Sequence, residues 1–219
     1  MELMLALIVG SLVFTLLYQP VQVDYIKTLY NIKASSGFTG KQVIEELLSY
    51  SQIEDVRILV HKPTKEFFIP YYEYVKKEIV LSEEAAHQTS VYSIAISLHE
   101  AFHAIQEKEN HLSRVLRRKG RYHSLAFVYF ILPLLFLANL LFPAYESLWV
   151  FSSMFIFILS CLFHLITIVS LEIHANIHTY RYMERNRLVT PSELKHVRNL
   201  FLITTLGYVF ATPVSIFSP

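Results

Sequence analysis

Four long segments of the chain contain no Asp, Glu, Lys or Arg: residues 3–19, 124–142, 147–171 and 199–219. A helix needs about 17–25 apolar residues to cross the hydrocarbon core of a bilayer, and each segment reaches that length. The alternative is a set of buried core helices, but so small a protein rarely buries several helices that are apolar all round. The pattern therefore predicts about four transmembrane helices. The first is expected to be an uncleaved anchor, because Leu16-Leu17-Tyr18-Gln19 offers no small-residue cleavage site.

Between the first two segments, residues 20–123 alternate helical and strand patterns. Thr39 with Gln42 three positions later predicts a capping box that opens a helix, whose apolar stripe follows at once. Alternating apolar positions at Val56, Ile58 and Val60 predict a strand. Residues 67–69 and 78–81 are two more short strand candidates, and residues 90–109 repeat apolar positions at helical spacing.

Composition and charge narrow the class of protein. Hydrophobic residues make up 53% and charged residues 17% of the 219 residues, which excludes a disordered or collagen-like chain. One cysteine, Cys161, excludes a disulfide framework and a Cys-rich zinc module within one chain. A net charge of +1 gives no argument for a nucleic-acid partner.

The basic residues indicate a topology. All 19 Lys and Arg lie in residues 20–123 and 172–198, which four spans would place on the same side of the membrane. By the positive-inside rule that side is the cytoplasm. Five of these residues, between Arg114 and Arg121, directly precede the second span. A nucleic-acid patch is the alternative reading of this cluster, but its position beside the membrane favours contact with the lipid bilayer.

These observations predict a mainly α membrane protein with a small cytoplasmic α+β domain. The expected divisions are an N-terminal transmembrane anchor (1–19), a cytoplasmic α+β region (20–123), a transmembrane helical hairpin (124–171), a second cytoplasmic segment (172–198) and a C-terminal transmembrane helix (199–219). The sequence gives no prediction of the oligomeric state.

One motif within the predicted helix 90–109 points to chemistry. His99-Glu100-Ala101-Phe102-His103 is an H-E-x-x-H sequence. Spacing of i and i+4 on a helix places both imidazoles on one face, where they can share a tetrahedral metal ion. Glu100 is turned away by about 100° and can reach a water at the metal. The alternative is a helix that carries two surface histidines and a solvated carboxylate.

A catalytic zinc site needs a third protein ligand. The candidates follow the third span: Glu172, the first charged residue beyond the membrane, and its rivals His174 and His178. Asn176, one turn beyond Glu172, is placed to orient a ligand imidazole. His164 is an easily ionisable side chain within a predicted span. Such a residue has either a functional role or a hydrogen bond to a neighbouring helix.

The sequence resembles the YugP-type family of bacterial membrane zinc metallopeptidases, which is distantly similar to the HtpX and CAAX-protease gluzincins. The resemblance rests on the N-terminal anchor and on four further pieces in family order: Ser35-Ser36-Gly37-Phe38-Thr39-Gly40, Val80-Leu81-Ser82-Glu83, His99-Glu100-x-x-His103-Ala104-Ile105-Gln106 and Glu172-x-x-Ala175. The chain departs from the family at Phe102, where the family usually has Gly before the second His.

The resemblance implies a zincin-like domain that binds Zn²⁺ through His99, His103 and Glu172, with Glu100 as the catalytic base. It implies a metalloendopeptidase of the bacterial cell membrane that cleaves proteins or peptides. The distribution of Lys and Arg predicts that its active site faces the cytoplasm, and a site at the membrane surface suggests membrane proteins among its substrates. The strand near residues 78–81 is expected to pair with an extended substrate.

Two other kinds of protein compete with this enzyme, and the flanking residues argue against the first, because they place the motif outside the bilayer. An intramembrane metalloprotease would carry its H-E-x-x-H inside a hydrophobic span, whereas Ser90, Glu107, Lys108 and Glu109 flank the motif here. A non-catalytic four-span membrane protein would use the zinc for structure or sensing. Coordination by four protein ligands, with His174 or His178 closing the site, would favour that second alternative.

Overall fold

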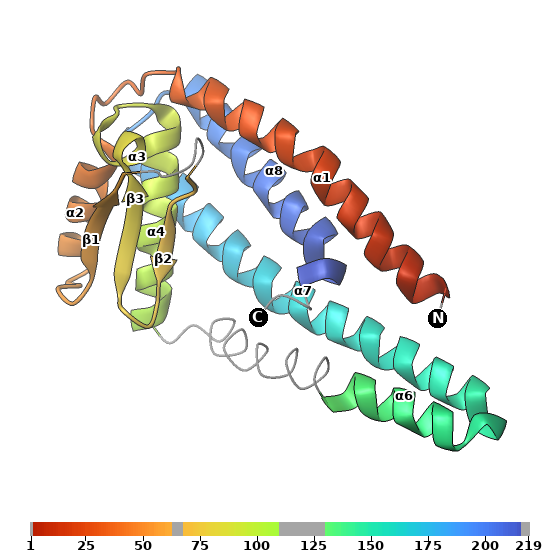
Figure 1. The fold of residues 1–219 in the computed structure, drawn as a ribbon. Helices are drawn as coiled ribbons and strands as arrows, with labels where there is room; N and C mark the ends of the chain where they lie inside the picture. The colour runs from red at the N-terminus through yellow and green to blue at the C-terminus, as the bar shows by residue number, and fades with distance from the viewer. Residues whose placement is uncertain (1, 63–67, 110–129, 216–219) are drawn as a thin grey trace. The chain divides into compact units, whose positions relative to one another are not determined.

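The computed structural model describes residues 2–62, 68–109 and 130–215 (Figure 1). Contacts divide the chain into two compact units. The helical unit comprises Met1–Pro20, Leu112–Leu171 and Thr205–Pro219, and the α+β unit comprises Val21–His111 and Glu172–Thr204. Three long helices contribute residues to both units: α1 (Glu2–Tyr30), α7 (Glu146–Arg185) and α8 (Pro191–Ser215).

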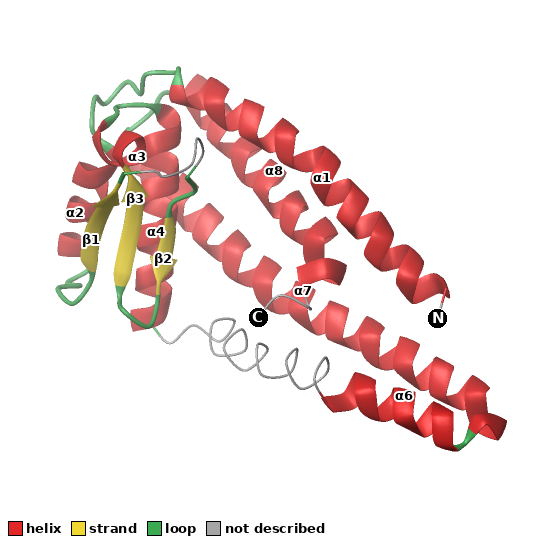
Figure 2. Ribbon diagram, viewed as in Figure 1, coloured by secondary structure: helices red, strands yellow, loops and turns green. Residues whose placement is uncertain are grey.

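A three-stranded sheet of order β1-β3-β2 lies in the α+β unit (Figure 2). Strand β3 (Glu78–Ser82) is the central strand and is buried throughout its length. It pairs in parallel with β1 (Arg57–His61) and antiparallel with β2 (Tyr71–Glu73). The predicted strands near Val56 and residues 78–81 are therefore present. The expected pairing of residues 78–81 with a substrate is wrong, because both edges of β3 already carry a strand.

The third strand prediction, residues 67–69, is also wrong for its described part. Phe67 lies outside the described residues, and Phe68–Pro70 form no strand. Strand β2 begins immediately after Pro70, at Tyr71. Proline has no N–H to donate to a sheet, so it fits before a strand better than within one.

The helices of the α+β unit begin at side-chain caps that the sequence carries. Helix α2 (Gly40–Tyr50) begins at the Thr39–Gln42 capping box, as predicted, and buries its apolar stripe. Helix α3 (Glu83–His87) follows β3 directly and is capped by Ser82. Helix α4 (Val91–Lys108) is capped by the Ser90 hydroxyl. A side chain at Gly40 would meet the backbone oxygen of Ala85 at 2.1 Å, so only glycine allows α2 this close to α3.

Parts of α1, α7 and α8 complete the core of the α+β unit. The Tyr25 hydroxyl of α1 donates to the backbone oxygen of His196 in α8 at 3.2 Å. Leu29 of α1, Met183 of α7 and Val197 of α8 are fully buried in the same core as the inner face of α4. The motif helix is therefore enclosed by elements from distant parts of the chain.

The helical unit contains α6 (Leu132–Leu141), the short 3₁₀ helix η2 (Pro143–Tyr145) and the remaining parts of α1, α7 and α8. The Ser11 hydroxyl donates to the backbone oxygen of Phe210 at 2.6 Å and so ties α1 to α8. Large apolar side chains along these helices are exposed, among them Leu17, Leu134, Phe136, Phe151 and Ile166.

Two helices in the described part of the chain, not the predicted four, have the length and hydropathy of a membrane span. They are Ala6–Tyr30 and Pro143–Arg185, and their most apolar stretches are 6% and 17% buried. Segment 124–142 lies partly outside the described residues, and its described helix α6 has only 10 residues. Helix α8 does not qualify in its described part: segment 199–219 lies partly outside the described residues, and the first turns of α8 carry Glu193, Lys195 and Arg198.

Candidate metal centre

Helix α4 places the two motif histidines side by side in the interior of the α+β unit. His99 and His103 are each 7% exposed. Their rings meet edge to face, with centroids 4.6 Å apart. The Nε2 atoms of the two rings are 3.0 Å apart. The i, i+4 spacing of the motif therefore produces the convergence of imidazoles that the sequence predicted.

Helix α7 brings Glu172 to the same point. Its Oε2 lies 3.2 Å from Nε2 of His99, and its Oε1 lies 3.7 Å from Nε2 of His103. One ligand atom from each of the three residues lies within 4.8 Å of the others, and all three side chains are buried. The structure thus brings together two imidazole nitrogens and one carboxylate oxygen.

The chemistry of this group fits a divalent cation. Two facing imidazole nitrogens 3.0 Å apart leave room for one proton at most, so at least one lone pair points at the other ring. A buried carboxylate beside them needs a positive charge to compensate for its lost hydration. An ion held by two His nitrogens and a Glu oxygen would satisfy all three groups, and this is a ligand set that catalytic zinc uses.

The carboxylate of Glu172 interacts electrostatically with the imidazole of His99. Burial opposes protonation of His99, but the hydrogen bond and the charge of Glu172 outweigh it and raise the pKa of His99. A side-chain hydrogen bond with Asn176, one turn further along α7, acts in the same direction. Asn176 thus lies where the sequence predicted a residue that orients a ligand imidazole.

Glu100 lies beside the three-residue group and is not one of its members. It is 6% exposed, and burial raises the pKa of its carboxyl group. Positive charge on His99 and His103 opposes this rise, as does a hydrogen bond from the backbone N–H of Tyr72. The Tyr72 hydroxyl also donates to Oε2 of Glu107, two turns along α4, at 2.5 Å. Strand β2 is therefore fastened to the face of α4 that carries Glu100.

The structure does not bring the rival ligands His174 and His178 into the group. The Nδ1 atom of His174 accepts a hydrogen bond from Nε2 of Gln106 at 2.9 Å. The ring of His178 packs against Phe102, with centroids 5.6 Å apart. His164 lies in the helical unit and is likewise outside the group.

Two residues of this centre received no role from the sequence. Gln106 was visible as the polar residue one turn after His103, but nothing in the sequence showed that its side chain is completely buried. Tyr72 carried no signal, because its contacts with α4 depend on where β2 docks.

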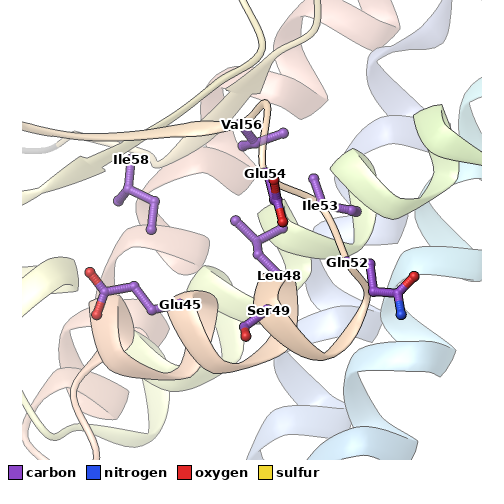
Figure 3. A pocket seen from close by; sticks show the side chains of 8 residues that line it. All are labelled: Glu45, Leu48, Ser49, Gln52, Ile53, Glu54, Val56 and Ile58. Atoms are coloured by element: carbon purple, nitrogen blue, oxygen red, sulfur yellow. The ribbon is translucent and has the colours of Figure 1, made fainter.

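A separate hollow of about 340 Å³ lies between α2 and the residues leading into β1 (Figure 3). Apolar side chains of Leu48, Ile53, Val56 and Ile58 line it together with the carboxylates of Glu45 and Glu54. None of its lining residues belongs to the metal-ligating group.

The family comparison matches nearly the whole chain. A family described as "Putative neutral zinc metallopeptidase" matches residues 3–218. The chain belongs to this family. Comparison with the curated proteins and with the solved structures finds no match. Membership confirms the resemblance drawn from the sequence and implies Zn²⁺ as the cofactor, and His99, His103 and Glu172 form a group that can hold it.

Proposed function

We propose that this protein is a membrane-embedded zinc metalloendopeptidase of the gluzincin type, which hydrolyses peptide bonds of proteins or peptides at the cytoplasmic membrane surface. The observation that carries the proposal is the convergence of Glu172 on the two motif imidazoles, with Glu100 beside them. Family membership supports zinc-dependent peptidase activity.

His99, His103 and Glu172 would hold the zinc, which when bound supplies a Lewis acid that polarises the scissile carbonyl and acidifies water. Glu100 then acts as general base: it takes a proton from the attacking water and delivers that proton to the nitrogen of the departing amine. Burial of the Glu100 carboxyl raises its pKa and so strengthens it as a base. The backbone N–H of Tyr72 holds this carboxylate in position.

Strand β2 is the better candidate for pairing with an extended substrate. Among the described strands it pairs only with β3, so one of its edges faces away from the sheet. It also contacts the motif helix through Tyr72. A substrate added at that edge would run beside the face of α4 that carries Glu100.

The two long apolar helices support the membrane part of the proposal. Few residues of their most apolar stretches are buried, whereas a core helix of a soluble protein buries such residues. Glu172 follows the apolar part of α7 directly. This position supports an active site at the bilayer surface, and the concentration of Lys and Arg in residues 20–123 and 172–198 supports its cytoplasmic orientation.

A structural or sensory zinc site is the competing function. Such sites usually have four protein ligands, whereas catalytic sites have three and leave a position for water. In the described part of the chain, the metal-ligating group has three members. This count favours catalysis.

The test combines zinc quantification with hydrolysis of model peptides by the full chain in detergent. Glu100→Gln should retain one zinc per chain but lose about 10²–10⁴-fold in cleavage rate, because the amide cannot accept the proton. Glu109→Gln, at the exposed C-cap of α4, is the matched control and should cleave at the native rate. Native cleavage by the Glu100→Gln variant would overturn the proposal.

A further inference from the structure

A hydrogen-bonded chain runs from the second motif histidine to α7 on the side away from the metal-ligating group. The Nδ1 atom of His103 lies 2.8 Å from Oε1 of Gln106. The other end of the same amide, Nε2 of Gln106, lies 2.9 Å from Nδ1 of His174. Gln106 is fully buried, so the orientation of its amide group is set by protein atoms.

The direction of this chain follows from the donor and acceptor capacity of each group. A metal ion at Nε2 of His103 requires a lone pair there, so the proton of the neutral ring must be on Nδ1. That N–H can donate only to the oxygen of the Gln106 amide. The amide NH₂ group then faces α7 and donates to Nδ1 of His174.

Without His174, the Gln106 amide would lose its hydrogen-bond acceptor on α7, which favours the present orientation of the amide. A rotation of the amide by 180° would present NH₂ to Nδ1 of His103 and favour the tautomer with the proton on Nε2. That tautomer cannot bind a metal through Nε2. His174 therefore controls a ligand on a different helix through one intervening side chain.

We propose that Gln106 and His174 are positioning residues that hold His103 in its metal-binding tautomer, with Gln106 acting as a relay between the ligand and α7. The proposal deepens the proposed function and rests on it. It gives a role to His174, which the metal-ligating group leaves out.

The test measures the zinc Kd of the full chain in detergent by competition with a chelator, a readout independent of peptide cleavage. Gln106→Met removes the acceptor for His103 and should weaken zinc binding by about 10–100-fold, as loss of outer contacts of metal ligands typically does. Gln106→Glu keeps an acceptor oxygen towards His103 and should bind zinc at least as tightly as the native chain does.

The decisive comparison is a double-mutant cycle with His174→Phe, which keeps the ring but removes the acceptor. In the native background this change should weaken zinc binding about tenfold, because the amide loses the acceptor on α7 that favours its present orientation. In the Gln106→Glu background it should have no effect, since a carboxylate has no NH₂ group to present. His178→Phe, the same change one turn further along α7, is the matched control.

Two results would overturn the relay. One is an equal loss of zinc affinity on His174→Phe in both backgrounds, which would indicate a purely structural role for the ring. The other is native zinc affinity in Gln106→Met. Tight zinc binding without peptide cleavage in the native chain would instead contradict the proposed function while leaving the relay supported, so the two failures are distinguishable.

Discussion

The Oε2 atom of Glu172 lies 3.2 Å from Nε2 of His99, although 73 positions separate the two residues in the chain. One residue is on α7 and the other on α4. Both side chains are more than nine-tenths buried, so the pair forms inside the α+β unit and not at its surface. This contact completes a three-residue group around a point that a cation can occupy.

Replacement of Glu172 by Gln should abolish stoichiometric zinc binding. The substitution keeps the size of the side chain but removes the negative charge that a buried divalent cation requires. The loss of affinity should exceed the roughly 10–100-fold that outer contacts typically contribute. Zinc content measured after extensive dialysis checks the prediction. Glu146→Gln, in the first turn of the same helix, is the control and should retain zinc.

Removal of zinc by a chelator should destabilise the native chain. A ligand that binds only the folded state stabilises it by about 2.7 kcal/mol at a free concentration of 100 times its Kd. Thermal unfolding with and without chelator should therefore show a lower Tm without zinc. The same comparison on His99→Phe should show no difference, because that variant lacks one of the two imidazole ligands. An equal chelator effect on both proteins would mean that zinc binds elsewhere.

Replacement of Phe102 by Ala should destabilise the α+β unit. Phe102 is 8% exposed and packs against the rings of His178 and Tyr182 on α7. Truncation of a buried Phe typically costs about 3–5 kcal/mol in free energy of unfolding. Chemical denaturation in detergent measures this cost. Tyr50→Ala is the control, because Tyr50 is 83% exposed and its loss should change stability by no more than about 0.5 kcal/mol.

The proposed orientation predicts which residues a membrane-impermeant thiol reagent reaches in intact cells. With Cys161 replaced by Ser, Tyr145→Cys should be labelled from outside, since η2 precedes the apolar part of α7. Tyr50→Cys, on the proposed cytoplasmic side, should react only after cell lysis. Both tyrosines are well exposed, so burial does not explain a difference in labelling. The reverse pattern would contradict the cytoplasmic location of the active site.

Local signals predicted much of the α+β unit correctly. The Thr39–Gln42 capping box and the apolar stripe after it specified α2, because both depend on residues three or four positions apart. Alternation specified β1, and the 3.6-residue period specified α4. The predictions that failed concern features that depend on tertiary contacts. Pro70 precedes β2 and does not follow a strand, and residues 78–81 became a central strand, which no local pattern distinguishes from an edge strand.

The number of membrane helices was less predictable than their existence. Absence of charge over 17 or more residues identified α1 and α7. Residues 199–219 are also free of charge, but helix α8 is described only to Ser215 and its first turns carry charged residues. The charge pattern therefore predicts more spans than the described residues contain.

By itself, the sequence determined that His99 and His103 share a helix face with Glu100 beside them, since the i, i+4 geometry of an α-helix is local. Only the tertiary structure decided which side chain of α7 joins them. Positions 172 and 174 differ by about 200° around that helix. Glu172 and Asn176 therefore share the face that meets His99, while His174 contacts Gln106 and His178 contacts Phe102. The packing of α7 against α4 sets that rotation, and packing depends on residues from the whole unit.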